Sequence, residues 1–294
     1  AWANPERFAS GGVTVGCPPD FYNQQGQDWG QPPFNPRYLE ATGYQVYREM
    51  VHSMYEHAGA VRIDHVLGLF RLWWIPQGLG ARNGAYVTYN HEAMLGVLAI
   101  GATRAGGMVV GEDLGTVPDY VRRILADHGV LGTDVEWFNR VDDSPNAGDP
   151  YRAPKDYRKQ ALASVTTHDL PPTAGYLNFA HVKLREELLE AFAASAMAER
   201  TAMMNRLVEN GYISQTVADD VEGHVQEIVE AMHAMLTDTP SLLLQAALVD
   251  GVGECRSQNQ PGTSREYSNW RVPLADSSGH VVHTDEVFDL PRVQ

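Results

Sequence analysis

The stretch Gly107-Met108-Val109-Val110-Gly111-Glu112 is a short apolar run that ends on a carboxylate. A second stretch earlier in the chain, Ala60-Val61-Arg62-Ile63-Asp64, has a similar form. Short, nearly continuous apolar runs are typical of parallel strands that are buried on both faces of a sheet. Each stretch therefore predicts one buried strand with an acidic residue at its carboxyl end.

Helical patterns alternate with these strands. Apolar residues recur at helical spacing between Tyr47 and Ala58, and residues 91–104 also predict a helix. Strands that alternate with helices indicate parallel βα units and an α/β fold class. The same patterns predict strands at 134–138, 162–169 and 241–248, and long helices at about 181–210 and about 214–236.

Acidic residues end three of the predicted strands, at Asp64, Glu112 and Asp169. In a (β/α)8 TIM barrel the carboxyl ends of the strands form the active-site face, so acids at these positions indicate catalysis. A doubly wound open sheet also binds ligands at strand carboxyl ends. We rank the open sheet second, because the sequence has no Gly-x-Gly-x-x-Gly nucleotide-binding loop.

The composition excludes several classes of protein. With 44% hydrophobic and 20% charged residues, the chain is expected to be globular, and its net charge of −15 disfavours nucleic acid as a partner. No apolar run reaches the roughly 18 residues of a membrane span. The first residues lack the features of a signal peptide. Cys17 and Cys255 form no disulfide or zinc pattern, so we expect a cytoplasmic protein with no membrane partner.

Acids at successive strand ends fit one chemistry well. Retaining glycosyl transfer uses two carboxyl groups about 5–5.5 Å apart, of which one attacks the anomeric carbon and the other acts as acid and then base. A single Asp after a strand is more often a helix cap or a surface charge. Three acids at successive strand ends are a stronger indication of a catalytic site.

Longer segments around these acids resemble a known group of enzymes. Val61-Arg62-Ile63-Asp64-His65, Gly111-Glu112-Asp113-Leu114-Gly115 and Thr167-His168-Asp169 resemble, in this order, the motifs of strands four, five and seven of the α-amylase clan. Across essentially the whole chain the resemblance is to the 4-α-glucanotransferases, or amylomaltases. The segments that narrow it are Pro18–Tyr22, Gly26–Gly30, Trp73–Pro76, Asn259–Thr263 and Asn269–Arg271.

The resemblance implies a role for each acid. Asp64 would be the nucleophile, Glu112 the general acid/base, and Asp169 the carboxylate that holds sugar hydroxyls in the transition state. Arg62 lies two residues before Asp64, so on a strand both side chains face the same way and the cation would favour an ionised nucleophile. Glu112 must begin the cycle protonated, so we expect its surroundings, including Asp64, to raise its pKa.

Further residues are expected to bind the substrate. A long Gly- and Pro-rich loop is predicted over residues 10–37, and its Trp29 and Tyr22 would stack on glucose rings and exclude water. His168 would donate a hydrogen bond to a sugar hydroxyl. The aromatic pair after Pro-Pro-Asp often reads Tyr-Phe in the family but is Phe21-Tyr22 here. With Arg62, the expected substrate-binding set is Asp20, Tyr22, Trp29, His168 and Asn259.

The resemblance also implies a domain organisation. A family barrel has eight strands, and this chain would hold the part from just after strand three to strand eight, with a helical elaboration between strands seven and eight. The missing N-terminal part of the barrel is then expected to be needed for closure. Within one catalytic portion over 1–294, we expect an active-site loop region at 1–40, βα units with the catalytic acids at 41–180, a helical segment at 181–240, and the last strand and tail at 241–294.

The expected function is retaining transfer of α-1,4-glucan segments between maltooligosaccharides, or to glucose, through a covalent glycosyl-enzyme. This chemistry needs no cofactor and no metal. Two alternatives stay open: an α-glucan hydrolase that uses the same three acids, and a truncated, inactive glycan-binding fragment. A metal-dependent hydrolase built on His65, His91 and His168 is disfavoured, because no His-x-His or His-Glu-x-x-His motif occurs.

Overall fold

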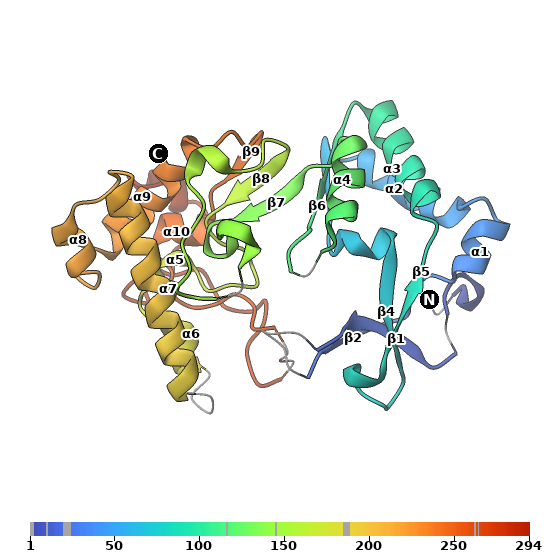
Figure 1. Ribbon diagram of the computed structural model, residues 1–294, viewed down its shortest axis with the longest axis horizontal. Coiled ribbons are helices and arrows are strands. Elements are labelled where there is room, and N and C mark those ends of the chain that lie inside the picture. Colours follow the sequence, from blue (N-terminus) through green and yellow to red (C-terminus); the bar gives the residue numbers. More distant parts are fainter. Residues whose placement is uncertain are drawn as a thin grey trace. The chain divides into compact units, whose positions relative to one another are not determined.

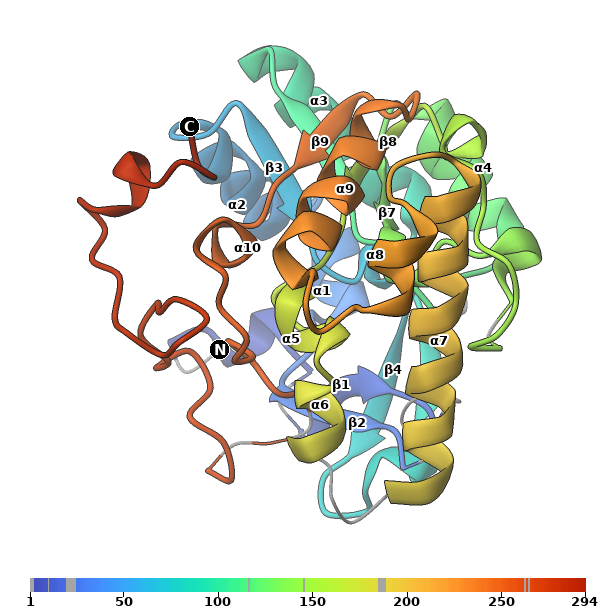
Figure 2. The ribbon, with the colours of Figure 1, turned by 90° about the vertical axis from the view of Figure 1, so that its left-hand side faces the viewer.

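The chain alternates between helices and short strands, as Figures 1 and 2 show. The computed structural model describes residues 3–9, 11–19, 25–115, 117–144, 146–184, 189–261, 263 and 265–294. The chain divides into two compact units, residues Ala1–Thr133 and Asp134–Gln294. Each unit is described by itself below.

The first unit contains two separate sheets. One is antiparallel and has the strand order β2-β1-β4-β5, and the other is the parallel pair β3-β6. The long loop predicted over residues 10–37 is wrong in part, because β1 and β2 lie within it and pair with each other. The strands are β1 Val13–Cys17, β2 Gln27–Gln31, β3 Ala60–Ile63, β4 Arg71–Pro76, β5 Ala85–Thr88 and β6 Met108–Gly111.

Capping residues set the helix ends of this unit. The Asn35 side chain accepts hydrogen bonds from the first turn of α1, and Asn90 does the same for α3. Gly106 ends α3 in the left-handed conformation that glycine adopts without strain. The helices are α1 Pro36–Ala41, α2 Gln45–Tyr55, α3 His91–Ala105 and α4 Asp119–Asp127.

The core of the first unit lies between the helices α2 and α3 and the pair β3-β6. Val51 from α2 and Leu95 and Leu98 from α3 are almost completely buried there, together with Val61 of β3. The helices predicted at 47–58 and 91–104 are therefore confirmed as α2 and α3. The strands predicted before Asp64 and Glu112 are confirmed as β3 and β6.

The second unit contains a sheet of order β7-β8-β9, in which β8 and β9 run parallel. Its long helix α7 packs on α8, while α9 packs on β8 and α5 (Figure 2). The strands are β7 Gly132–Val135, β8 Ala161–Ser164 and β9 Leu243–Gln245, and the first residues of β7 still belong to the first unit. The helices are α5 Thr173–Leu177, α6 Ala180–Leu184, α7 Leu189–Glu209, α8 Gln215–Asp219, α9 Val225–Thr237 and α10 Leu248–Val252.

The core of the second unit is rich in methionine. Met203 of α7 and Met232 and Met235 of α9 are fully buried, because their unbranched side chains fit irregular gaps between helices and sheet. A charged pair also lies inside this unit: the Arg206 guanidinium is 2.6 Å from the Glu136 carboxylate, and both side chains are buried.

Candidate active site

Asp64 and Glu112 follow directly after two paired strands. The register of β3 and β6 ends at the pair Ile63 and Gly111, and the two acids are the next residue of each chain segment. The Glu112 backbone N–H donates to the Ile63 carbonyl at 2.9 Å, so the alignment continues past the strand ends. In a parallel pair the carboxyl ends lie at the same edge, and both acids are therefore presented there.

Asp64 is an exposed carboxylate with a cation beside it. Its Oδ1 accepts a hydrogen bond from Arg62 Nη1 at 2.7 Å, and its side chain is 76% exposed. The two residues are separated by one position of a strand, which places their side chains on the same face. The expected pairing of Arg62 with Asp64 is confirmed.

Glu112 lies in a different environment from Asp64. Its Oε2 accepts the backbone N–H of His65 at 2.9 Å, and its Oε1 accepts that of Leu114 at 2.7 Å. Burial raises the pKa of the Glu112 carboxyl above its usual value, the two backbone hydrogen bonds oppose the rise, and the negative charge of Asp64 adds to it. The raised pKa expected from the sequence is confirmed, although burial is its main cause and Asp64 a smaller one.

His65 connects the two acids through its backbone. It has a φ of 46°, a left-handed conformation that is uncommon for residues other than glycine, and in this conformation its N–H donates to Glu112. Its ring packs edge-on against the Trp29 ring, with centroids 5.1 Å apart. Burial lowers the pKa of the His65 imidazole, and the Asp64 carboxylate opposes that shift. The His65 ring therefore favours its neutral form and packs against Trp29 of β2.

Asp113, the neighbour of Glu112, is turned into the protein. Its Oδ1 accepts the backbone N–H of Thr133 at 2.9 Å, and its Oδ2 lies 3.7 Å from Arg122. The Thr133 hydroxyl also donates to the Gly111 carbonyl at 3.1 Å. These contacts fix the end of β6 to Thr133 and Arg122. Of the two neighbouring acids, Glu112 is the one whose carboxylate contacts His65.

Asp169 belongs to the second unit and lies in a loop rather than at a strand end. The strand predicted over 162–169 ends already at Ser164, because the chain then turns through a segment closed by the Thr166 hydroxyl, which donates to the Pro171 carbonyl at 2.9 Å. The Asp169 Oδ1 accepts Asn259 Nδ2 at 2.7 Å. His168 Nε2 lies 3.3 Å from its other oxygen.

The loop that carries Asn259 is anchored by a buried acid. Glu254 accepts the backbone N–H groups of Arg256 at 2.9 Å and Ala275 at 3.0 Å, and Arg256 Nη2 donates to it at 2.7 Å. Further along the loop, the exposed Trp270 ring lies 5.5 Å from the His168 ring. Asp169, His168, Asn259 and Trp270 are therefore brought together within the second unit.

The predicted residues thus fall into groups that each lie within one unit. Arg62, Asp64, Glu112 and Trp29 are in the first unit, and Trp29 is 39% exposed, with its indole N–H donating to Gln27 Oε1 at 3.2 Å. The predicted substrate-binding residues Asp20 and Tyr22 lie outside the described residues.

Sequence reasoning gave no role to several groups that the structure places at these acids. The backbone N–H groups of His65 and Leu114 could not be assigned, because a donor direction depends on the turn that follows the strand. His65 and Trp270 do stand inside the quoted motifs, and His65 also belongs to the disfavoured metal-site alternative.

Within the ranges that the structure describes, no three His, Cys, Asp or Glu side chains are grouped so as to hold a metal ion. Among the same residues, no helix combines the length and apolar character needed to cross a membrane.

Comparison with known proteins decides the family. The profile of glycoside hydrolase family 77, described as 4-alpha-glucanotransferase, matches residues 1–278. The chain belongs to this family. Among the curated relatives from family 77, the 4-alpha-glucanotransferase of Mycobacterium tuberculosis (strain H37Rv) is 49% identical over 294 residues. That of Haemophilus influenzae is 32% identical over 284 residues.

The alignments cover most of this chain but less of each relative. They include 98% of this chain in the mycobacterial case and 93% in the Haemophilus case, and the chain spans 40% of the length of each of these family 77 relatives.

Solved structures show the same α/β fold. The amylomaltase from Corynebacterium glutamicum superimposes with a TM-score of 0.91 at 39% identity, covering 99% of this chain and 42% of that one. The amylomaltase from Streptococcus agalactiae, solved in complex with acarbose, superimposes with a TM-score of 0.69 at 19% identity, covering 99% of this chain and 52% of that one. The predicted α/β class and the resemblance to the amylomaltases are confirmed.

Proposed function

We propose that this family 77 chain carries the nucleophile, Asp64, and the general acid/base, Glu112, of a retaining 4-α-glucanotransferase. The observation that carries the proposal is the contrast between two carboxyl groups at the ends of paired strands. Asp64 is exposed and paired with Arg62, whereas burial raises the pKa of Glu112. Two acids whose environments differ in this way can divide the roles of nucleophile and proton donor.

In the first half of the reaction, an ionised Asp64 oxygen attacks the anomeric carbon of the donor sugar. The bond between that carbon and the glycosidic oxygen breaks, and the protonated Glu112 gives its proton to the leaving oxygen. The result is a glycosyl ester on Asp64, and Glu112 is left ionised. The backbone N–H groups of His65 and Leu114 stabilise this ionised form, because each donates to one of its oxygens.

In the second half, Glu112 acts as a base. It takes the proton from the 4-hydroxyl of an acceptor glucan, whose oxygen attacks the anomeric carbon while the bond to Asp64 breaks. Two inversions at the same carbon retain the α configuration. Because the intermediate preserves the energy of the cleaved bond, the cycle needs no cofactor and no metal.

Asp169 is assigned to the transition state, where its carboxylate would bind sugar hydroxyls as the ring distorts. Its contacts with Asn259 and His168 support this role, because both side chains orient the carboxylate and carry further polar groups. We assign Asn259 and His168 to substrate binding for the same reason. Arg62 belongs to the same set through its contact with Asp64.

The substrates proposed are α-1,4-glucans and maltooligosaccharides. The names of the family 77 relatives support this class. The complex of the Streptococcus relative with acarbose supports it as well. For the fold, we propose the barrel portion from just after strand three to strand eight, with helices α6 to α9 as the elaboration between the last two strands.

Transfer is favoured over hydrolysis if water is kept from the glycosyl-enzyme. Trp29 packs against His65, whose backbone contacts Glu112, so we assign the strand β2 and its Trp29 to shielding this side of the acids. Tyr22 and Asp20 are proposed as substrate contacts on the sequence alone.

The test is the product pattern from maltotriose. Transfer gives glucose together with maltooligosaccharides longer than maltotriose, whereas hydrolysis gives only glucose and maltose. We expect the Asp64→Ala variant to lose transfer and Glu112→Gln to lower its rate by about 10²–10⁴-fold.

A second readout identifies the intermediate. With α-maltosyl fluoride, whose fluoride leaves without protonation, Glu112→Gln should form the Asp64 ester, and added azide should attack it to give an azide product of α configuration. A β-configured product would mean a single displacement and would contradict the nucleophilic role of Asp64.

A further inference from the structure

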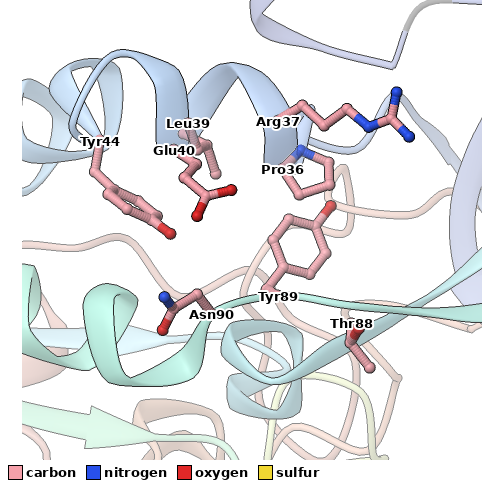
Figure 3. Close-up of a pocket in the computed structure, with 8 residues that line it drawn as sticks. All are labelled: Pro36, Arg37, Leu39, Glu40, Tyr44, Thr88, Tyr89 and Asn90. Atoms are coloured by element: carbon pink, nitrogen blue, oxygen red, sulfur yellow. The ribbon is translucent and has the colours of Figure 1, made fainter.

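A pocket of about 250 Å³ lies in the first unit and shares no lining residue with the candidate active site (Figure 3). It is formed where helix α1 and the turn after it face the end of β5 and the start of α3. The lining residues are Pro36, Arg37, Leu39, Glu40, Tyr44, Thr88, Tyr89 and Asn90.

Part of the pocket lining is apolar and firmly held. The Tyr89 side chain is buried, and its hydroxyl donates to the Phe34 carbonyl at 2.7 Å, so the ring cannot easily turn away. Pro36 and the buried Leu39 lie beside it. With Tyr89 7% and Leu39 0% exposed, these residues shape the pocket from within the core rather than offer a ring face to a ligand.

The rest of the lining is polar and offers both donors and acceptors. In Figure 3 the Glu40 carboxylate points into the space between Tyr44 and Tyr89. Burial and the Glu40 charge raise the pKa of the Tyr44 hydroxyl, which therefore stays protonated and can donate. Asn90 Oδ1 accepts the Ala93 N–H at 3.1 Å as the cap of α3, and within the described residues its Nδ2 has no hydrogen-bond partner.

These groups select a neutral polyhydroxyl ligand. Glu40 points inward while the Arg37 guanidinium points away, so an anion would be repelled. One carboxylate is too few for a metal ion, and no metal-binding group of acids and histidines occurs among the described residues. The volume is below the roughly 300–1,000 Å³ of sites for drug-sized molecules, which suits a single sugar ring.

We propose that this pocket is a non-catalytic binding site for one glucosyl ring of an α-glucan. The choice of glucose as the sugar rests on the function proposed above. The Glu40 carboxylate would accept from two neighbouring hydroxyls, and Asn90 Nδ2 and the Tyr44 hydroxyl would donate. A second site on the same unit raises the effective concentration of a long glucan at the acids, but it does not help one too short to span both.

Substitutions at Asn90 and Glu40 provide the test. Asn90→Asp keeps an oxygen that caps α3, since Asp and Asn are nearly equal caps, but it replaces the Nδ2 donor with a second acceptor that faces Glu40. Asn35→Asp makes the same change at the cap of α1, outside the pocket lining. Glu40→Gln removes the charge, and Glu49→Gln is its control on the exposed face of α2.

The measurement is titration of the chain with maltose, followed by two-dimensional NMR, in an Asp64→Ala background that prevents turnover. We expect maltose to shift the backbone resonances of residues 37–44 and 88–90. The affinity should fall about tenfold in Asn90→Asp and in Glu40→Gln, as expected for loss of a hydrogen bond to a charged or donor group. The two controls should stay within about twofold of the parent.

Two results would overturn the inference: no shift in these residues, or unchanged maltose affinity in both pocket variants. The proposed function is judged separately, by products from maltotriose with Asp64 intact. Transfer without shifts in the pocket would leave the function standing and remove this site. Resonance shifts in the pocket without glucan transfer from maltotriose would leave this site standing and remove the proposed function.

Discussion

At Glu112, opposing effects act on one carboxyl group. Burial and the Asp64 charge favour its protonated form, while two backbone N–H donors and the Arg62 cation favour its ionised form. The net effect is a raised pKa, so the group is protonated over a wider pH range than a free glutamate. A carboxyl group that must first donate and then accept a proton needs this balance.

Replacing Arg62 with an uncharged residue should move the pH profile of kcat/KM to higher pH. Arg62 lowers the pKa of Glu112, so Arg62→Met should raise that pKa further. Activity requires protonated Glu112 at the start of the cycle and is lost as the pH rises through its pKa. The alkaline limb of kcat/KM should therefore move to higher pH in Arg62→Met.

The prediction concerns the pH at which kcat/KM falls on the alkaline side, not the size of kcat/KM itself. Arg62→Lys keeps the charge and should leave the limb in place, even if both variants are slower because the contact with Asp64 is altered. A limb that moves to lower pH in Arg62→Met would contradict the assignment of the limb to Glu112. The measurement is kcat/KM for maltotriose transfer as a function of pH.

At the scale of elements, α2 and α3 approach closely at one glycine. A Cβ added at Gly101 would lie 2.4 Å from Val51 Cγ1, and Val51 is a buried, β-branched residue of α2 that has little freedom to move. On the same helix, a Cβ at Gly96 would meet nothing within 4 Å. The two glycines are thus chemically identical but differ in what surrounds them.

We expect opposite effects from the same substitution at these positions. Gly96→Ala should raise the free energy of unfolding by about 0.5–1 kcal/mol, because alanine loses less backbone entropy in a helix. Gly101→Ala should lower it by about 1–3 kcal/mol through overpacking against Val51. Urea unfolding of both variants measures this difference. If Gly101→Ala were as stabilising as Gly96→Ala, close packing of α2 on α3 would be ruled out.

For the whole molecule, the two units have separate apolar cores. One is centred on α2 and α3, the other on α7 and α9. The second core also encloses the Arg206–Glu136 pair, in which Arg206 Nη2 donates to the Tyr157 hydroxyl at 2.9 Å. Burial raises the pKa of Glu136, and Arg206 opposes this rise. A buried charge of this kind is tolerated only while its partner is present.

Removing Arg206 should therefore destabilise one unit selectively. Arg206→Met leaves Glu136 buried without its cation, which costs about 3–5 kcal/mol. Hydrogen exchange should accelerate in residues 134–294 and remain unchanged in α2 and α3. The double variant Glu136→Gln with Arg206→Met should recover part of the loss, because no charge then stays buried. Equal loss of protection in both units would contradict independent cores.

Much of the local structure could be predicted from the sequence. Strands β3 and β6 and helices α2 and α3 were expected, because their apolar residues recur with the periods of a strand or a helix over short distances. The strands within residues 10–37 were not expected, since Gly- and Pro-rich segments resemble loops and gain their order by pairing: β1 pairs with β4, from a later part of the chain. The end of the strand before Asp169 was misplaced because the turn depends on Thr166 and Pro171.

For the candidate site, the sequence by itself determined that Asp64 and Glu112 follow directly after strands and that Arg62 faces Asp64, because both depend on residues close together in the chain. Only the tertiary structure decided the burial of Glu112, the N–H of His65 that holds it, and the contact of Asn259 with Asp169, 90 residues apart. Packing sets such contacts between distant segments, and a pattern of neighbouring residues carries no record of them.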